Sequence, residues 1–495
     1  MSTDRPLARE LIAMTLDRAS FRSWDIALPA LPIEDSYSAE LEAARRSTGE
    51  DEAVITGEGT LDGARVAVIV GEFGFLGGSI GVNAAGRIVA AFERATADGI
   101  PVLAAPVSGG TRMQDGTRAF LQMVKITEAV VAHKAARLPY LVYLRHPTTG
   151  GVFASWGSLG HITVAQTGAL VGFLGPKVYR ALHGEDFPAN VQTAENLFAH
   201  GIVDAVLDPQ RLRFVAGEAL AIMSARALHT VPAAEAPISD ISPAWESIVI
   251  SRRSGRPGVR SLLHYAAGAV VSLSGTGQGE SNKSSVVALA TFGGHGAVVV
   301  GLDRRAQGFH TALGPDALRQ ARRGMALAAD LGLPLITVID TAGAALSREA
   351  EEGGLAGEIA RCLADLLDLA VPTIAVILGE GTGGAALALI PTDRVIAARH
   401  GWLAPLPPEG ASVIVYGNID HAAAMTVDQR VRSQDLLDDG IVQEIIEERP
   451  EADLEPAAFC RRVGAGIVRQ LGELCAIDDQ ARRAARTRHY RQLGK

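Results

Sequence analysis

The second half of the chain repeats the punctuation of the first half at a fixed distance. A Gly-x-Pro triplet, a lone glycine, a proline and a Gly-Gly pair each recur 233 positions later, and a Gly-Ile-Val triplet recurs at 239. Several matches at one offset are hard to attribute to chance, and so long a period indicates two copies of one domain rather than a solenoid of short repeats. The matched positions include Gly99 and Gly332, Gly110 and Gly343, Pro139 and Pro372, Gly150 and Gly383, and Gly201 and Gly440.

Each copy alternates helices with strands, which is typical of an α/β fold. A helix leads through Gly-x-Pro into a short apolar strand, a glycine turn and a second, amphipathic helix. A Leu-Pro or Val-Pro then opens another apolar strand, which ends at the Gly-Gly pair. In the first copy the amphipathic helix is predicted from Phe120, Met123, Val124, Thr127 and Val131. The predicted helices lie at 84–97 and 315–330, and the strands at 102–105, 335–339, 140–144 and 373–378.

The domain boundaries follow from the repeat and from composition. A chain of 495 residues is longer than one hydrophobic core usually supports. The Pro-rich stretch 231–243 (VPAAEAPISDISP) is typical of a connection. We therefore predict an N-terminal domain over 1–228, a linker over 229–260 and a C-terminal domain over 261–495.

Charge and cysteine content exclude several classes of protein. A net charge of −9 and a pI of about 5.8 argue against a nucleic-acid partner. Three scattered cysteines, at 362, 460 and 475, fit neither a disulfide framework nor a metal site, and they suit a reducing compartment. The N-terminus lacks the apolar core of a signal peptide, and no apolar run is long enough to cross a membrane. We expect a cytoplasmic protein with no membrane, nucleic-acid or metal site.

The Gly-Gly pairs stand where an apolar strand stops and a helix is predicted to begin: PTTGGVFASW at 147–156 and GEGTGGAALAL at 379–389. The first N–H groups of a helix have no intrahelical partner, and glycine lets a substrate oxygen approach them. Such a turn suits an oxyanion hole or a phosphate site. The simpler alternative is that the glycines only permit close packing of helix against strand.

Two other motifs allow other functions. Gly379, Gly381 and Gly384 spell the G-x-G-x-x-G of dinucleotide-binding folds, but the first copy lacks these spaced glycines and no acidic residue follows at the required distance. Residues 77–81 (GGSIG) match the G-x-S-x-G nucleophile elbow of hydrolases, although the preceding GEFGF is a poor strand.

Two oxyanion holes in one protein would suit a reaction that creates two oxyanions. Transfer of a carboxyl group from carboxybiotin to the α-carbon of a thioester is such a reaction. Negative charge develops on the ureido oxygen of biotin and on the thioester oxygen. The biotin nitrogen can itself accept the α-proton, so the reaction demands no side-chain base.

The motifs also resemble a known family, over roughly residues 60–210 and 290–445. In the first half, 70–81, 108–116, 147–156 and 172–176 (VGEFGFLGGSIG, SGGTRMQDG, PTTGGVFASW, GFLGP) look like the β subunit of acetyl-CoA carboxylase carboxyltransferase. In the second half, 333–344, 379–389 and 407–412 (LPLITVIDTAGA, GEGTGGAALAL, PPEGAS) are similar to the α subunit. The resemblance implies two tandem crotonase-like ββα-superhelix domains, with acyl-CoA on the first and biotin on the second. In such enzymes the site forms where an N-type domain meets a C-type domain, commonly across a dimer interface.

The resemblance also implies roles for individual residues. Gly150 and Gly151 would hold the thioester oxyanion, and Gly383 and Gly384, with Ala385, the ureido oxygen. Arg112 would contact CoA phosphates or, equally, form an ion pair that holds its loop. The remaining residues expected to line the clefts are Gly77, Gly78, Gly109, Gly110 and Gly343.

Several departures from the family pattern bear on function. No cysteine lies in residues 1–60, so the zinc ribbon of many bacterial β subunits is missing. The segment 340–346 reads DTAGAAL where the α subunit usually has a proline and an aromatic residue. No biotinylation motif appears, so carboxybiotin must arrive from biotin carboxylase and biotin carboxyl carrier subunits.

The resemblance thus predicts the carboxyltransferase of a biotin-dependent acyl-CoA carboxylase, converting for example acetyl-CoA to malonyl-CoA in fatty acid biosynthesis. A homo-oligomer, a dimer or a hexamer, is expected. A malonyl-thioester decarboxylase of the same fold and a non-catalytic scaffold subunit are the alternatives. The acyl group and the carrier are left open.

Overall fold

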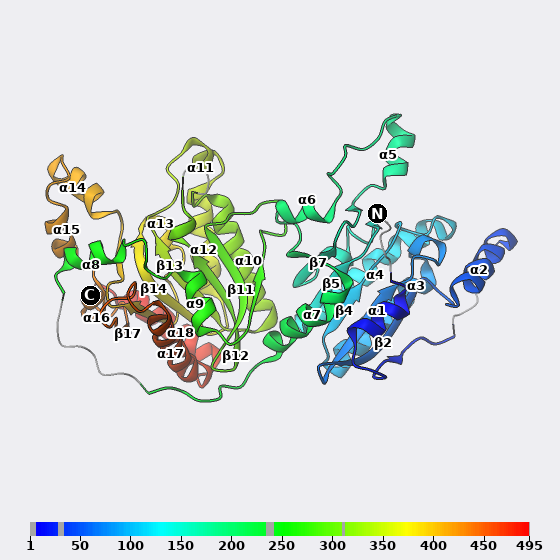
Figure 1. The fold of residues 1–495 in the computed structure, drawn as a ribbon, viewed down its shortest axis with the longest axis horizontal. Coiled ribbons are helices and arrows are strands. Elements are labelled where there is room, and N and C mark those ends of the chain that lie inside the picture. The colour runs from blue at the N-terminus through cyan, green and yellow to red at the C-terminus, as the bar shows by residue number, and fades with distance from the viewer. Residues whose placement is uncertain (1–5, 28–33, 234–241, 309–311, 495) are drawn as a thin grey trace. The chain divides into compact units, whose positions relative to one another are not determined.

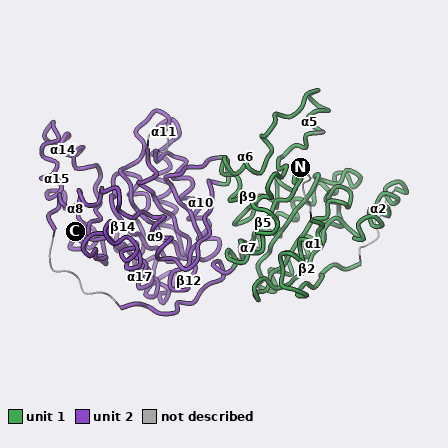
Figure 2. Tube along the Cα trace, in the orientation of Figure 1, with its two compact units in different colours: residues 1–220, 277–279 green, residues 221–276, 280–495 purple. Residues whose placement is uncertain are grey.

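The computed structural model describes residues 6–27, 34–233, 242–308 and 312–494 (Figure 1). It forms two compact units, residues 1–220 with 277–279 and residues 221–276 with 280–495, and each is described by itself (Figure 2). Both are α/β, as predicted. Residues 234–241 of the Pro-rich stretch lie outside the described part of the chain.

The first unit is built on a seven-stranded sheet of order β1-β2-β3-β4-β5-β7-β9. The first two pairings are antiparallel and the others are parallel. A two-stranded parallel pair, β6 and β8, continues beyond β5. The strands are β1 Arg22–Ser23, β2 Val54–Leu61, β3 Ala64–Gly71, β4 Val102–Ala105, β5 Tyr140–Leu144, β6 Thr148–Thr149, β7 Ile162–Gln166, β8 Val171–Gly172 and β9 Ala205–Leu207. The helices are α1 Ala8–Thr15, α2 Asp35–Thr48, α3 Val82–Asp98, α4 Gly116–Ala135, α5 Pro176–His183, α6 Ala194–Ala199 and α7 Pro209–Ser224, which runs past the boundary at 220.

The second unit repeats this plan in the order β10-β11-β12-β13-β14-β15-β17, with β16 paired to β14. The strands are β10 Val270–Leu273, β11 Ser285–Phe292, β12 His295–Leu302, β13 Leu335–Thr341, β14 Thr373–Thr382, β15 Arg394–Ala398, β16 Trp402–Ala404 and β17 Glu444–Ile446. The helices are α8 Ala244–Ser251, α9 Val259–Ala266, α10 Pro315–Leu331, α11 Arg348–Glu352, α12 Leu355–Asp368, α13 Gly383–Leu387, α14 Pro408–Tyr416, α15 Ala422–Asp428, α16 Ser433–Asp438, α17 Pro456–Cys475 and α18 Asp479–Gln492.

The duplication seen in the sequence is a duplication of the fold. Helices α3 and α10 each have 17 residues, and their first residues lie 233 positions apart. The strands that follow them, β4 and β13, and the next pair, β5 and β14, keep the same offset. Helices α6 and α16 and strands β9 and β17 are shifted by 239, as the later motif predicts. The first half of β14 therefore occupies the place in its sheet that β5 occupies in the sheet of the first unit.

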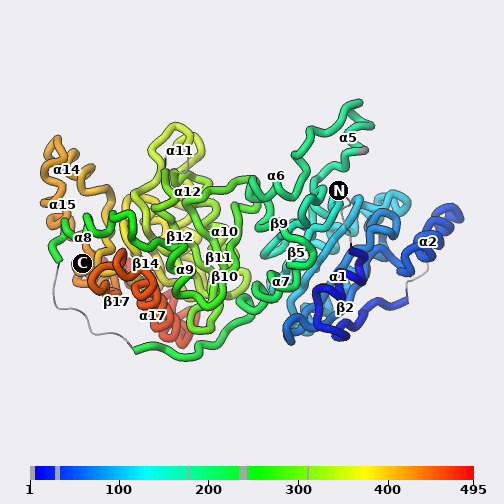
Figure 3. Tube along the Cα trace, in the orientation of Figure 1, coloured from blue at the N-terminus to red at the C-terminus, as the bar shows by residue number. Residues whose placement is uncertain are grey.

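Continuous apolar strands explain why the sheet of the second unit is covered on both faces. Alternate strand residues pack against α9 and α17, which Figure 3 shows side by side although they are far apart in the chain. Residues of the opposite parity face α10, where Gly324 lies against Val300 and Val287. Every residue of β14 is buried. A helix layer thus covers each face of the sheet that contains β14.

The helix predicted after the first glycine turn forms, but its buried face differs from the apolar pattern. In α4 Met123 is buried, whereas Phe120, Val124 and Val131 are 63%, 66% and 59% exposed. The inward face is lined instead by other residues, including Ala119 and Ile126. Apolar residues occupy both faces of α4, so periodicity alone did not identify the buried one.

Two helical glycines give a test of this packing. A Cβ on Gly324 would lie 2.3 Å from Val300 Cγ2, while a Cβ on Gly86 of α3 would meet no atom within 4 Å. Gly86→Ala should stabilise the protein by about 0.5–1 kcal/mol, because alanine is the better helix former. Gly324→Ala should destabilise it by about 1–2 kcal/mol through overpacking. Urea denaturation measures both, and equal effects would contradict the packing described.

Candidate active site

The first glycine pair follows β6 in the first unit. Gly150 has a φ of 65°, a left-handed conformation that favours glycine, and its N–H donates to the carbonyl of Phe173 at 2.9 Å. The Ala154 N–H donates to the Gly150 carbonyl at 3.0 Å, which closes one helical turn. The pair therefore opens a single turn here, where the sequence predicts a helix. The N–H of Gly151 has no acceptor among the described residues.

A neighbouring turn of the same unit, after β4, packs against this double-glycine turn. Gly110 has a φ of 119°, and its N–H donates to Ser108 Oγ at 3.0 Å. The carbonyl of Ser108 accepts the Thr149 N–H at 2.9 Å, which joins the two loops. A Cβ on Gly150 would come within 3.2 Å of Gly110 Cα. The two backbones approach so closely that a side chain at Gly150 would push them apart.

The other glycines predicted for this cleft divide into two groups. The Gly109 N–H donates to the Gly77 carbonyl at 2.9 Å, and no atom lies within 4 Å of a Cβ built on Gly77. These two glycines border open space beside the turn. Gly78 instead faces the Val107 carbonyl, 2.2 Å from an added Cβ. Its lack of a side chain serves packing.

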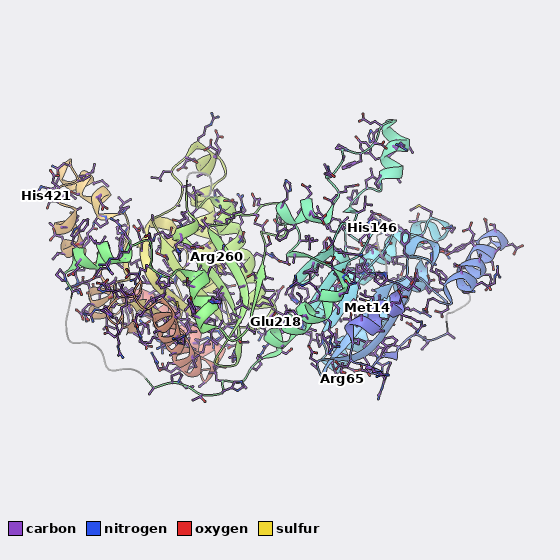
Figure 4. All side chains as sticks on the ribbon, viewed as in Figure 1. Met14, Arg65, His146, Glu218, Arg260 and His421 are labelled. Carbon is purple, nitrogen blue, oxygen red and sulfur yellow. The ribbon has the colours of Figure 1, made fainter. Side chains whose placement is uncertain are left out.

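A histidine supports the loop that leads into the first turn. His146, which is labelled in Figure 4, directly precedes the short connection to β6. Its ring Nδ1 accepts the Leu170 N–H at 2.9 Å, and its backbone N–H donates to Gln166 Oε1 at 3.2 Å. These bonds connect the turn to the segment around β8. The imidazole therefore acts on the shape of the loop.

The second unit builds the same arrangement from equivalent residues. Gly383 has a φ of 69° and opens α13, as predicted. Gly343 has a φ of 117°, and its N–H donates to Thr341 Oγ1 at 3.0 Å. Thr341 lies 233 positions after Ser108, so both copies hold the glycine turn with a hydroxyl two residues before it. These hydroxyls were not predicted from the sequence, although their recurrence at the common offset is visible there.

Backbone N–H groups are the donors that this arrangement offers. The N–H groups of Gly384 and Ala385 precede the first intrahelical hydrogen bond of α13. Ala385 is fully buried and its methyl group carries no donor, so any hydrogen bond that it donates comes from its backbone N–H. A Cβ on Gly343 would meet only Thr382, at 3.9 Å, so the space above this turn is open. Donors of this kind suit an oxygen that acquires negative charge.

Arg112 lies close to the first turn but does not face open space. Its side chain is 2% exposed, as is that of Glu52, to which it donates at 2.5 and 3.0 Å. Its remaining N–H groups contact the carbonyl and hydroxyl of Ser79 and the hydroxyl of Tyr37. All five guanidinium donors are engaged. The geometry is therefore that of the loop-holding ion pair, and a contact with a CoA phosphate would require breaking it.

The two competing motifs do not form the sites that their sequences suggest. Gly379 and Gly381 lie within β14, where a Cβ would come 2.6 Å from Asp340 Oδ1 and 2.7 Å from the Trp402 carbonyl, respectively. They are packing glycines rather than a phosphate-binding loop. Ser79 follows a short 3-10 turn, and its hydroxyl donates to the Leu76 carbonyl at 2.8 Å. No strand positions it as a nucleophile.

Buried acids lie beneath the turns of the second unit. Asp340 and Glu380 are 1% and 3% exposed. Burial raises the pKa of each carboxyl group, against the effect of Arg304 beside Asp340 and of Arg252 beside Glu380. The positions 233 residues earlier are Val107 and Pro147, so the first unit has no equivalent acids at these places.

The described residues also bear on two other types of site. They contain no group of three or more His, Cys, Asp or Glu side chains placed to bind a metal ion. Among the described helices, none combines the length and apolar character that crossing a bilayer requires.

The two α/β units thus repeat one fold, and each carries an equivalent double-glycine turn. The model of the carboxyl transferase domain family matches residues 2–459, and the chain belongs to this family.

Proteins with similar sequences carry related names. The chain is 57% identical over 480 residues to the "probable biotin-dependent acyl-coenzyme A carboxylase beta3 subunit" of Mycobacterium tuberculosis, and 97% of each chain is covered. It is 34% identical over 481 residues to the "acetyl-coenzyme A carboxylase carboxyl transferase subunits beta/alpha" of Salinispora arenicola, covering 92% of this chain and 84% of that one.

Solved structures support the fold. Transcarboxylase 12S, crystallised as a hexamer with methylmalonyl-coenzyme A, matches with a TM-score of 0.74 at 21% identity, over 95% of this chain and 90% of that chain. A single-chain long-chain acyl-CoA carboxylase matches with a TM-score of 0.73 at 19% identity, over 93% of this chain and 45% of that one. The prediction of a carboxyltransferase of the biotin-dependent acyl-CoA carboxylases is confirmed.

The buried pair Arg112–Glu52 gives a test of the two roles considered for Arg112. Arg112→Met should destabilise the protein by about 3–5 kcal/mol, because it leaves Glu52 buried without its partner. Replacing both residues, as Met and Leu, should recover most of that loss. Urea denaturation measures the stability and calorimetry the affinity for malonyl-CoA. Unchanged stability with weakened CoA binding would instead show a phosphate contact.

Proposed function

We propose that the two glycine turns serve the two oxyanions of one carboxyl transfer. Gly150 and Gly151 receive the thioester oxygen of acyl-CoA, and Gly383 and Gly384 receive the ureido oxygen of biotin. One observation carries this proposal above the others: in each unit a double-glycine turn lies beside a glycine turn that a hydroxyl holds, and the two arrangements share one sequence offset. A reaction with a single oxyanion would need it only once.

The first turn acts on the acyl-CoA. When the α-proton leaves, negative charge moves to the thioester oxygen, and the unpaired N–H of Gly151 stabilises it. The close contact of Gly110 with Gly150 fixes the direction of that N–H, so little reorganisation is needed as the charge develops. Loss of one such donor typically costs on the order of 100- to 1,000-fold in rate.

The second turn fits a biotin ureido group. Carboxybiotin supplies the carboxyl group when it is bound. The open space above Gly343 and the free N–H groups at the start of α13 match a planar ring with one acceptor oxygen. These N–H groups stabilise the charge on that oxygen as the carboxyl group departs. Arg112, with all donors engaged, takes no part in this proposal.

The names of the relatives support a proposal for the partners. A chain so similar to one named as a beta3 subunit is proposed to work with separate subunits, a biotin carboxylase and a biotin carboxyl carrier that delivers carboxybiotin. Acetyl-CoA is one candidate acceptor, as the relatives named acetyl-coenzyme A carboxylase suggest. We place the reaction in the cytoplasm, in fatty acid biosynthesis.

We also propose that copies of the chain associate. Exposed apolar side chains gather on α4 in the first unit and on α14 in the second, and transcarboxylase 12S is a hexamer. A second copy would cover these faces. They are Phe120, Leu121, Val124 and Val131 on α4, and Val413, Ile414, Val415 and Tyr416 on α14.

Light scattering tests the association. We expect a dimer or a larger assembly at micromolar concentration, with an interface above about 2,000 Å². Ile414 is 71% exposed, and Ile414→Lys should weaken the association because it places a charge within the proposed interface. A wild-type chain that stays monomeric with full activity would contradict the proposed assembly.

The reaction is tested by carboxyl exchange between malonyl-CoA and free biotin. The purified chain should form carboxybiotin and acetyl-CoA in equal amounts. A decarboxylase would release CO₂ without carboxylating biotin, and a scaffold would show neither activity. Either result, under conditions where malonyl-CoA binds, would refute the proposed function.

Substitutions at the glycines test the two roles separately. Gly151→Val should impair use of acyl-CoA, and Gly384→Val should spare CoA binding yet slow transfer to biotin, each by about 100-fold or more. A Cβ on Gly384 would lie 2.7 Å from Ile359 Cδ1, so crowding must be controlled for. The double variant Gly384→Ala with Ile359→Ala removes the clash and keeps the methyl group over the turn. Recovered activity in that variant would mean that Gly384 serves only packing.

A further inference from the structure

The end of α8 contacts both the strand that leads to the biotin-side turn and a neighbouring helix. Arg252 donates to Glu380 of β14 at 3.3 Å and, through two nitrogens, to Glu409 of α14 at 2.6 and 3.2 Å. Its guanidinium carbon lies 5.6 Å from the centre of the Trp402 ring. This one side chain therefore joins three elements of the second unit. It lies in the segment 229–260 that the sequence marks as a linker.

Ser251 adds two further contacts to the same region. Its hydroxyl accepts the indole N–H of Trp402 at 2.8 Å, and its carbonyl accepts from Arg304 at 3.0 Å. Trp402 is the residue of β16 that pairs with Glu380 of β14. The end of α8 is thus fixed to β14 directly and through β16.

Arg304 extends the network to the second turn. It donates through Nε to Asp340 Oδ1 at 3.0 Å, and the same oxygen accepts the Glu380 N–H at 3.1 Å. Asp340 directly precedes Thr341, whose hydroxyl holds Gly343. Glu380 lies three residues before Gly383. In the second unit a buried acid therefore precedes each glycine turn. Asp340 accepts from Arg304 and from the Glu380 N–H, and Glu380 accepts from Arg252.

The first unit lacks this network. Its equivalents of Asp340 and Glu380 are Val107 and Pro147, which carry no charge. The two turns share their backbone geometry but not the side chains beneath it. The first unit also has a buried ion pair, Arg112 with Glu52, but no acid at these two places, so the acids that precede both glycine turns distinguish the second unit. Buried ion pairs are costly to desolvate and add little net stability, so a requirement of the biotin-side turn is the simplest reason to retain them there.

We propose that Arg252, with Glu380 and Glu409, is a positioning residue for the biotin-side turn. By linking β14 to the first turn of α14, it sets the direction of the N–H groups at Gly383 and Gly384. The proposal rests on the assignment of biotin to this turn. Arg252 does not touch the reacting atoms in this account. It acts through the placement of the donors, where a displacement of about 1 Å can cost about a hundredfold in rate.

The test compares Arg252→Met with a matched control in the first unit. Arg213 also bridges two carboxylates, Asp17 and Asp62, at 2.6 Å each, and its side chain is 35% exposed against 30% for Arg252. Arg213→Met should leave carboxyl exchange near the wild-type rate. Arg252→Met should lower kcat/KM for free biotin about tenfold to a hundredfold. The affinity for malonyl-CoA, measured by calorimetry, should stay unchanged.

Two further measurements separate positioning from general destabilisation. Hydrogen exchange followed by mass spectrometry should be faster in the peptide spanning 379–388 of Arg252→Met, with the melting temperature lowered no more than in Arg213→Met. Arg252→Lys keeps the charge but cannot bind Glu409 through two nitrogens, so its rate should fall between wild type and Arg252→Met.

The outcomes are distinct. Biotin kinetics and hydrogen exchange in Arg252→Met that match those of Arg213→Met would overturn the positioning role. An equal loss of malonyl-CoA affinity would also overturn it, because the effect would not be confined to the second turn. A wild-type protein without exchange activity would refute the proposed function instead, and the hydrogen-exchange comparison would still decide whether Arg252 holds the turn.

Discussion

The hydrogen bond from a glycine N–H to a hydroxyl two residues earlier is the contact on which both turns depend. Ser108 makes it for Gly110 and Thr341 makes it for Gly343, each at 3.0 Å. The bond holds a glycine with a φ near 118° at the end of one parallel strand, beside the double-glycine turn that follows the next strand. Because parallel strands place their carboxyl ends on one edge of the sheet, the two loops meet there.

Much of the fold was predictable from the sequence because glycine and proline mark the ends of its elements. The offset of 233 between Gly99 and Gly332, and between Pro139 and Pro372, located equivalent helices and strands in both copies. The burial of α4 was not predictable in the same way. Apolar residues lie on both of its faces, and the pattern does not say that Phe120 stays exposed in the isolated chain.

The candidate site was predicted at its glycines and missed at the residues that support them. A positive φ is a local property, so Gly150 and Gly383 could be recognised from the sequence. The partners of Arg112 and Arg252 lie 60 and 157 positions away, at Glu52 and Glu409, and only the tertiary structure brings them together. Because the segment around Arg252 follows a Pro-rich stretch, it was predicted to be part of a linker, and its contact with β14 was not expected. Long-range ion pairs of this kind leave no periodic signal.

The proposed use of backbone amides as donors has a consequence for how the reaction responds to its surroundings. A peptide N–H neither gains nor loses a proton across the physiological range, unlike an imidazole or a carboxylate. Its strength as a donor is set by the geometry of Gly151 and Gly384 alone. A reagent that modifies a side chain at either turn would therefore act only indirectly, by displacing the backbone that Ser108 or Thr341 holds. The donors of the proposed centre therefore change only when the backbone itself moves.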